Sequence, residues 1–244
     1  MLISKLSVRD IGEVQTKLEK KLEKATCLQE AAQIFVEDIY EIFSESIVLL
    51  RLFVTITKGE LPVRIQSFVE KLAKNADLNL EESSYVLTLL GSTGENPDWN
   101  KIENSKAHQG IPLATSDFVN SIPMMSALLE QLGFKLGWIR GEAEIVTEKI
   151  GMISGTFYVK EAGTAKDSKG RLIIAAQDFV KFYKVETVFG VGGGYLVADK
   201  FLTTICFLRE PIERKIAFLF QGLANLFKFK TQKFVKDKVK IFKV

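Results

Sequence analysis

The side chains best suited to ligand recognition gather in one irregular segment, residues 91–115. This segment contains Trp99, Asn100 and His108, which is the only histidine of the chain. An indole offers a flat apolar surface, whereas an amide or an imidazole can both donate and accept a hydrogen bond. Because a long connection without regular elements is uncommon and is often functional, we expect the segment to fold as a lid over a sheet. Trp99, Asn100, His108 and Trp138 would then line a ligand pocket.

The same segment is also consistent with a loop that stabilises only itself. In this alternative, Trp99 anchors the loop on the core, the asparagines close turns after Pro97, and His108 bonds to backbone carbonyls. The residue types do not decide between the two interpretations. A metal site is not expected, because no His or Cys lies near His108 in the sequence to complete a ligand set.

The sequence carries no recognised catalytic motif. It has no Gly-x-Ser-x-Gly elbow and no His-Glu-x-x-His helix, and its single histidine leaves one candidate base for a Ser-His or Cys-His mechanism. We therefore predict that the chain is not an enzyme and has no catalytic residues. The glycine-rich run 190–194 precedes a strand instead of opening a helix. We interpret it as a tight turn with positive φ and not as a phosphate-binding loop.

Hydrophobic periodicity predicts the helices around this segment. Residues 11–22 repeat an apolar residue every three or four positions, and residues 28–44 do the same, so both predict amphipathic helices. Further helices are expected after Pro62 and Pro123, because proline suits the first helical turn. The apolar stripes of the two N-terminal helices could pair with a second copy of the chain or fold back on their own domain.

Runs of β-favouring residues predict about six strands. In the first run, Arg51 and Thr55 lie on the face opposite a wholly apolar one. Gly91 is expected to end the second strand abruptly. The predicted strands are residues 47–56, 85–90, 138–148, 156–161, 185–191 and 201–208.

The stretch 172–212 reads as strand, helix, strand, turn and strand, followed by a helix. Within it, residues 176–180 (AQDFV), 185–193 and 201–212 together resemble the C-terminal half of GAF domains, the small-molecule sensor modules of bacterial signalling proteins. Weaker similarity extends back to about residue 28. The resemblance implies an α/β (α+β) fold, with a central antiparallel sheet of about six strands flanked by N- and C-terminal helices.

The resemblance also implies a function. A GAF-like domain senses a small molecule and acts on a signalling partner protein by contact, commonly as a homodimer through its terminal helices. The resemblance identifies neither ligand nor cofactor. Neither Cys27 nor Cys206 is followed by the histidine typical of relatives that attach bilins, and the Asn-Lys-Phe-Asp-Glu pattern of cyclic-nucleotide binders is absent from the sequence. The alternative is a ligand-free adaptor or dimerisation module in which the sheet is only a scaffold.

Charge is divided unevenly along the chain. Residues 228–244 contain seven lysines and one aspartate, a net charge of +6 within a formal total of +3, which leaves −3 for the rest. Apolar residues interleave with these lysines, so the segment could make weak contact with anionic lipid or nucleic acid. Alternatively, it forms a terminal helix with a solvated lysine face whose aromatic residues pack on the body.

These observations divide the chain into amphipathic helices over residues 1–44, a GAF-like sensor domain over 45–227 and a basic tail over 228–244. No run of eighteen apolar residues occurs, and charges interrupt the first residues before a signal peptide could form. A cytoplasmic location is therefore expected.

Overall fold

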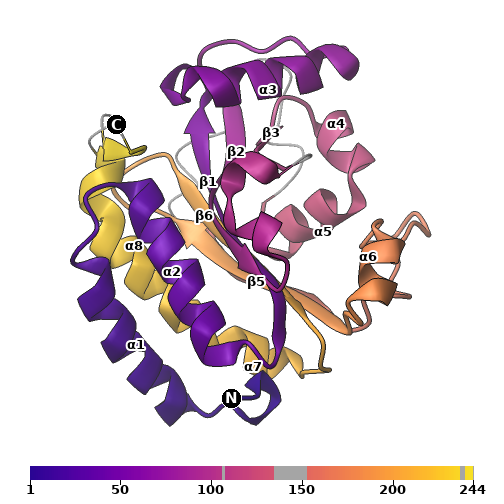
Figure 1. Ribbon diagram of the computed structural model, residues 1–244. Coiled ribbons are helices and arrows are strands. Elements are labelled where there is room, and N and C mark those ends of the chain that lie inside the picture. The colour runs from indigo at the N-terminus through magenta and orange to yellow at the C-terminus, as the bar shows by residue number, and fades with distance from the viewer. Residues whose placement is uncertain (106–107, 135–152, 237–239, 244) are drawn as a thin grey trace.

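Antiparallel strands form the centre of the structure, a computed structural model that describes residues 1–105, 108–134, 153–236 and 240–243. In these ranges six strands make one sheet with the order β3-β2-β1-β6-β5-β4, and neighbouring strands are antiparallel (Figure 1). The predicted fold class, a mixed α/β domain with a six-stranded antiparallel sheet, is confirmed. The strands are β1 (Ile47–Thr57), β2 (Tyr85–Gly94), β3 (Gly110–Pro112), β4 (Ser154–Val159), β5 (Thr187–Gly194) and β6 (Phe201–Leu208).

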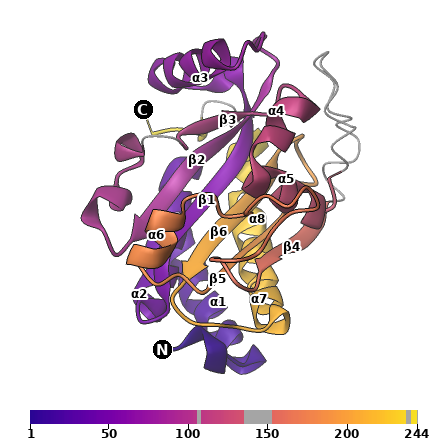
Figure 2. The same cartoon turned by 90° about the vertical axis from the view of Figure 1, so that its right-hand side faces the viewer.

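Helices cover both faces of the sheet (Figures 1 and 2). The α2 side carries α1 (Val8–Leu22), α2 (Leu28–Phe43) and α8 (Gln221–Lys236). The α6 side carries α4 (Ser116–Ser121), α5 (Pro123–Gln131) and α6 (Gln177–Phe182). Two further helices are α3 (Val63–Asn75) and α7 (Arg214–Leu219). The sheet therefore separates two hydrophobic cores, one on each side.

Strand β1 shows how the sequence serves both cores. Leu50 and Leu52 are buried in the core on the α2 side, whereas Leu49 and Phe53 are buried in the core on the α6 side. Because side chains alternate along a strand, Arg51 lies on the α6 side. Among the described strands, Arg51 thus places a cation on a sheet face that is otherwise mostly apolar.

The N-terminal helices fold back on their own domain. The apolar stripe of α1 packs against α8 and α2, and α2 packs on the sheet. The stripe residues of α1 are at most 6% exposed; they are Ile11, Val14, Leu18 and Leu22. These stripes are therefore covered within the same chain. In the described ranges, no helix combines the length and the apolar character that crossing a bilayer requires.

The first part of the basic segment 228–244 is the end of α8. Its Phe234 and Val235 are buried. Lys230 Nζ lies 2.7 Å from Glu19 of α1 and 2.9 Å from Glu23, the residue that follows α1. The described lysine-rich helix thus packs its apolar side on the body, as the second interpretation of this segment expects.

Glycines that were expected to end a strand or to form a turn lie inside strands. β2 continues beyond Gly91, and the run 190–194 belongs to β5 without any positive φ. A Cβ at Gly91 would lie 2.5 Å from the carbonyl oxygen of Ala32 on α2, and a Cβ at Gly190 would lie 2.1 Å from that of Thr204 on β6. The strand end predicted at Gly91 and the tight turn predicted at 190–194 were wrong, because these glycines lie inside strands and permit close packing between segments.

One strand comes from the segment that was expected to be irregular. Residues 110–112 form β3, which pairs with β2 at the edge of the sheet. The predicted strand 138–148 lies outside the described residues. Segment 91–115 is therefore partly regular, since it begins in β2 and contains β3.

Candidate functional site

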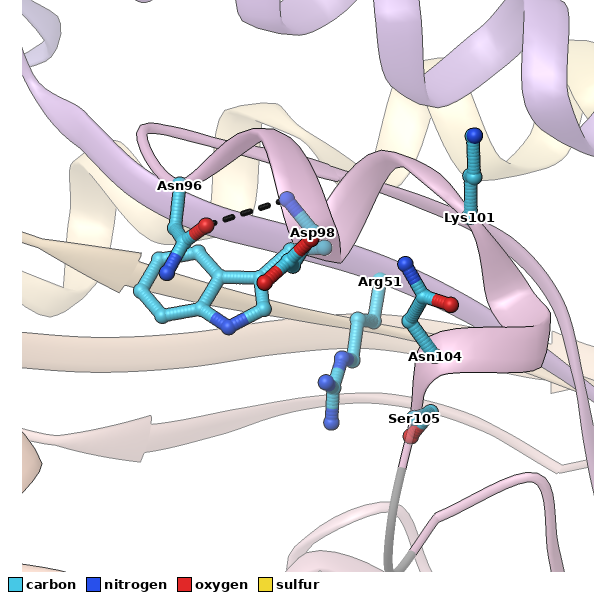
Figure 3. Close-up of a pocket in the computed structure, with 7 residues that line it drawn as sticks. Arg51, Asn96, Asp98, Lys101, Asn104 and Ser105 are labelled. Atoms are coloured by element: carbon cyan, nitrogen blue, oxygen red, sulfur yellow. Dashed lines mark hydrogen bonds between the residues drawn. The ribbon is translucent and has the colours of Figure 1, made fainter.

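A pocket of about 610 Å³ opens on the α6 side of the sheet, next to the segment that follows β2 (Figure 3). This segment forms two short helical turns, η3 (Pro97–Asn100) and η4 (Ile102–Asn104). The lining side chains combine two cations, a carboxylate, two amides, a hydroxyl and an indole. They belong to Arg51, Asn96, Asp98, Trp99, Lys101, Asn104 and Ser105. The volume falls within the usual range for small-molecule pockets.

Residues 96–105, which contain η3 and η4, form a cover over this pocket, and local hydrogen bonds hold it in place. The Asp98 N–H donates to Asn96 Oδ1 at 3.0 Å, which closes the start of η3 (Figure 3). Gln109 Nε2 donates to the carbonyl of Ser105 at 2.9 Å and to the carbonyl of Glu103 in η4 at 3.1 Å. Because these hydrogen bonds form within the segment or to the neighbouring Gln109, they order the cover above the sheet.

Trp99 is both an anchor and a wall of the pocket. The centroid of its ring lies 5.6 Å from that of Phe179 and 4.8 Å from that of Tyr183. A Cβ at Gly94 would lie 2.8 Å from Trp99 Cε3, so glycine allows the indole to approach β2 closely. Supported by these contacts, the indole presents a fixed apolar surface to the pocket.

Arg51 supplies a cation that has no carboxylate partner in the described ranges. Its Nη1 lies 3.3 Å from His108 Nδ1, and its buried Nε has no hydrogen-bond partner in the described part of the chain. The arginine ion pairs in that part form at other positions. Burial lowers the pKa of Arg51 to about 10, which leaves the guanidinium protonated at neutral pH.

His108 is a neutral neighbour of Arg51. An arginine N–H can only donate, so His108 Nδ1 accepts and the ring proton is assigned to Nε2. Although the residue keeps contact with solvent, desolvation of its ring and then repulsion by Arg51 lower the pKa of His108 to about 4. In the described ranges, no cluster of three or more His, Cys, Asp or Glu side chains could hold a metal ion.

The four site residues predicted from the sequence do not all line the pocket. Trp99 lines the pocket, and His108 touches the lining residue Arg51. Asn100 is not among the lining residues, because its Oδ1 accepts the N–H of Gly94 at 3.0 Å. Trp138 lies outside the described residues. Ligand binding by these four residues stays a prediction.

The place of Arg51 in the pocket lining was not predicted. From the sequence, Arg51 was expected only on the less apolar face of its strand. Arg51 is, however, the only charged residue in residues 47–57. A cation within an apolar strand costs free energy unless something pairs with it, and this was the available signal.

Asn100 and Asn104 form a matched pair for testing which asparagine is structural. We expect Asn100→Ala to lower the free energy of unfolding by about 1 kcal/mol, because the buried Gly94 loses the acceptor of its N–H. Asn104→Ala removes an exposed side chain without a described hydrogen bond and should change stability by less than about 0.5 kcal/mol. Urea unfolding measures both. Equal losses would contradict the assigned structural role of Asn100.

Comparisons with known proteins yield structural similarity only, since no family model and no curated protein matches the chain. The chromophore-binding domain of the bacteriophytochrome RpBphP3 from R. palustris is 8% identical, with a TM-score of 0.46 over 93% of this chain and 62% of that one. The phytochrome photosensory core module of Stigmatella aurantiaca is 8% identical, with a TM-score of 0.44 over 92% of this chain and 37% of that one.

A free methionine-R-sulfoxide reductase from Neisseria meningitidis, solved with its substrate, is also similar. It is 11% identical, with a TM-score of 0.47 over 97% of this chain and 98% of that one. The chain spans less than two thirds of the two phytochrome structures. At these identities and TM-scores, the similarities assign no ligand, activity or partner to this chain.

Proposed function

We propose that this chain is a GAF-like small-molecule-sensing domain that signals through protein contacts. The observation that carries the proposal is a pocket between the sheet and an ordered cover, with a guanidinium that lacks a carboxylate partner in the described residues. The GAF-like pattern of residues 172–212 and the antiparallel sheet support the same function.

Gln33 of α2 connects the strands below the pocket to the terminal helices. The Ser92 N–H donates to Gln33 Oε1 at 3.1 Å, and Gln33 Nε2 donates to the Ser92 carbonyl at 3.1 Å. Ser92 lies opposite Arg51 in the register of β1 and β2. A ligand that displaces Arg51 would therefore move the strand pair tied to α2, and α2 contacts both α1 and α8.

A protein partner would contact the outer surfaces of the terminal helices, because their inner stripes are covered. Exposed apolar side chains include Val8 of α1, Phe218 of α7 and Phe229 of α8, at 74%, 62% and 66% exposure. We propose that a signalling partner, or a second copy in a homodimer, binds there. Weak contact of residues 228–244 with an anionic surface is a separate proposal.

Native mass spectrometry of the protein purified from its own host tests the sensing function. We expect a retained small molecule, and a metabolite screen should find compounds that raise the melting temperature by binding the folded state. A clean mass without adduct, together with a screen that finds no stabilising compound, would contradict sensing and favour the ligand-free adaptor.

Trp99→Leu should abolish retention of that molecule, because it removes the flat wall of the pocket. Phe179→Leu is the matched control: it weakens the aromatic contact that anchors Trp99 but changes no lining residue. Both changes should cost about 1–2 kcal/mol of stability, measured by urea unfolding. If both variants lose the ligand equally, the self-stabilising loop is the better interpretation.

A further inference from the structure

We propose that the pocket binds a flat monocarboxylate, with its carboxylate paired to Arg51 and its aromatic or apolar body packed on Trp99. This inference rests on the small-molecule function proposed above and specifies the chemical class of the ligand.

The guanidinium of Arg51 has a buried N–H group without a hydrogen-bond partner in the described residues. A cation taken out of water is destabilising unless it is paired, and elsewhere this chain pairs one: Lys200 Nζ lies 2.8 Å from Glu60 Oε2, with both side chains below 10% exposure. Among the described residues, the side chain that Arg51 contacts by a hydrogen bond is a neutral imidazole, and the buried Nε of Arg51 has no partner there. The planar fork of an arginine matches the two coplanar oxygens of a carboxylate.

A second unsatisfied group lies in the same lining. Ser105 is 8% exposed, and its buried Oγ has no hydrogen-bond partner among the described residues. In the view of Figure 3, the Arg51 side chain runs downward from β1, and its guanidinium ends to the left of Ser105. A bound carboxylate would accept from the Ser105 hydroxyl as well as from the guanidinium. The unpaired Arg51 Nε and Ser105 Oγ can both donate a hydrogen bond, so they fit a ligand that accepts hydrogen bonds.

The charge of the lining favours a single negative charge on the ligand. Arg51 and Lys101 are cations and Asp98 is an anion, which gives the lining a formal charge of +1 with His108 neutral. Two arginines near the same segment are already paired, Arg64 with Glu103 and Arg209 with Glu95. A monocarboxylate balances the pocket, whereas a phosphate dianion would be repelled by Asp98.

Trp99 favours a ligand whose part beyond the carboxylate is flat and apolar. Because Phe179 and Tyr183 support the indole, it can pack against a flat ring without first being ordered. An aromatic or other flat apolar group beside the carboxylate fits this surface, and a volume of about 610 Å³ accommodates it.

Titration calorimetry with three probes that share a naphthalene ring tests the proposal: naphthoate, its uncharged analogue naphthamide, and naphthyl phosphate. Naphthoate should bind at least about tenfold more tightly than either other probe. Arg51→Met keeps an apolar side chain of similar length and should lose at least about tenfold in naphthoate affinity, with naphthamide affinity unchanged. Arg51→Gln is a second variant with the same expected loss. Arg9→Met, at an exposed arginine that pairs with Glu13 on α1 and lies outside the lining, should bind naphthoate like the wild type.

Several results would overturn the proposal. They are equal affinity for naphthoate and naphthamide, unchanged naphthoate binding by both Arg51 variants, tighter binding of naphthyl phosphate, and no binding of any probe. If native mass spectrometry still finds a retained molecule that depends on Trp99, the sensing function stands and only the ligand class is wrong. If no molecule is retained and no screened compound binds, the sensing function fails as well.

Discussion

Gly190→Ala is expected to destabilise the fold by about 3 kcal/mol, because the new Cβ would meet the backbone of the neighbouring strand. An ideal Cβ at this position lies 2.1 Å from the carbonyl oxygen of Thr204, which no side-chain rotation can relieve. Val191, the residue after Gly190, is also bonded to Thr204: the Thr204 Oγ1 accepts the Val191 N–H at 3.1 Å and donates to the Val191 carbonyl at 3.2 Å. Moving β6 away would therefore also break these bonds.

Gly12→Ala is the matched control for Gly190→Ala. Gly12 lies in α1, and no atom would approach its added Cβ within 4 Å. Since alanine favours helices more than glycine does, this variant should gain about 0.5–1 kcal/mol. Urea unfolding of both variants gives the two changes in stability. Similar small effects at both positions would contradict the close approach of β5 and β6.

Lys200→Met is expected to cost about 3–5 kcal/mol, because it leaves the carboxylate of Glu60 buried without its cation. The two side chains are 8% and 9% exposed, and Glu60 Oε1 already lacks a partner in the described residues. Adding Glu60→Met to Lys200→Met should recover most of the loss, because an apolar pair replaces two charges. Chemical unfolding of the single and double variants measures this coupling. A single variant as stable as the wild type would contradict a buried ion pair.

The same pair predicts a pH dependence. Burial by itself raises the pKa of Glu60, but Lys200 and Thr57 outweigh burial and bring the pKa below the ordinary value of 4.5. A carboxyl with a lowered folded-state pKa stabilises the protein above its unfolded pKa, and this contribution is lost as the pH falls below 4.5 through the folded value. The stability difference between the wild type and Lys200→Met should therefore narrow over that range. A constant difference would contradict the proposed linkage.

The sequence predicts much of the architecture because most elements follow local patterns. Residues 201–208 were expected as a strand and form β6, and residues 47–56 lie within β1. The roles of Gly91 and Gly190 were not predictable in this way. Each depends on a backbone oxygen contributed by a distant segment, Ala32 of α2 and Thr204 of β6. Local composition gives the same signal for a glycine turn and for a glycine packing contact.

The candidate site was predictable only in part for the same reason. Trp99 stands out in a polar segment and lies in the pocket lining. Asn100 has the residue type of a ligand-binding group, but its hydrogen bond to Gly94 is visible only once the turn is folded. Arg51 is distant in sequence from the other lining residues, so the pocket depends on the pairing of β1 with β2.

In Figure 1, α1 and α8 lie on the side of the sheet opposite α5 and α6. The pocket opens on the α6 side, so it lies across the sheet from the outer surfaces of α1 and α8. A bound metabolite and a docked protein would consequently not compete for space, and a complex containing all three components is sterically allowed. Any influence between them must then be mutual: if the metabolite strengthens docking by some factor, docking strengthens metabolite binding by that same factor. A saturating amount of the metabolite could change the affinity of the docked protein, and the reverse, but neither could displace the other by blocking its binding site.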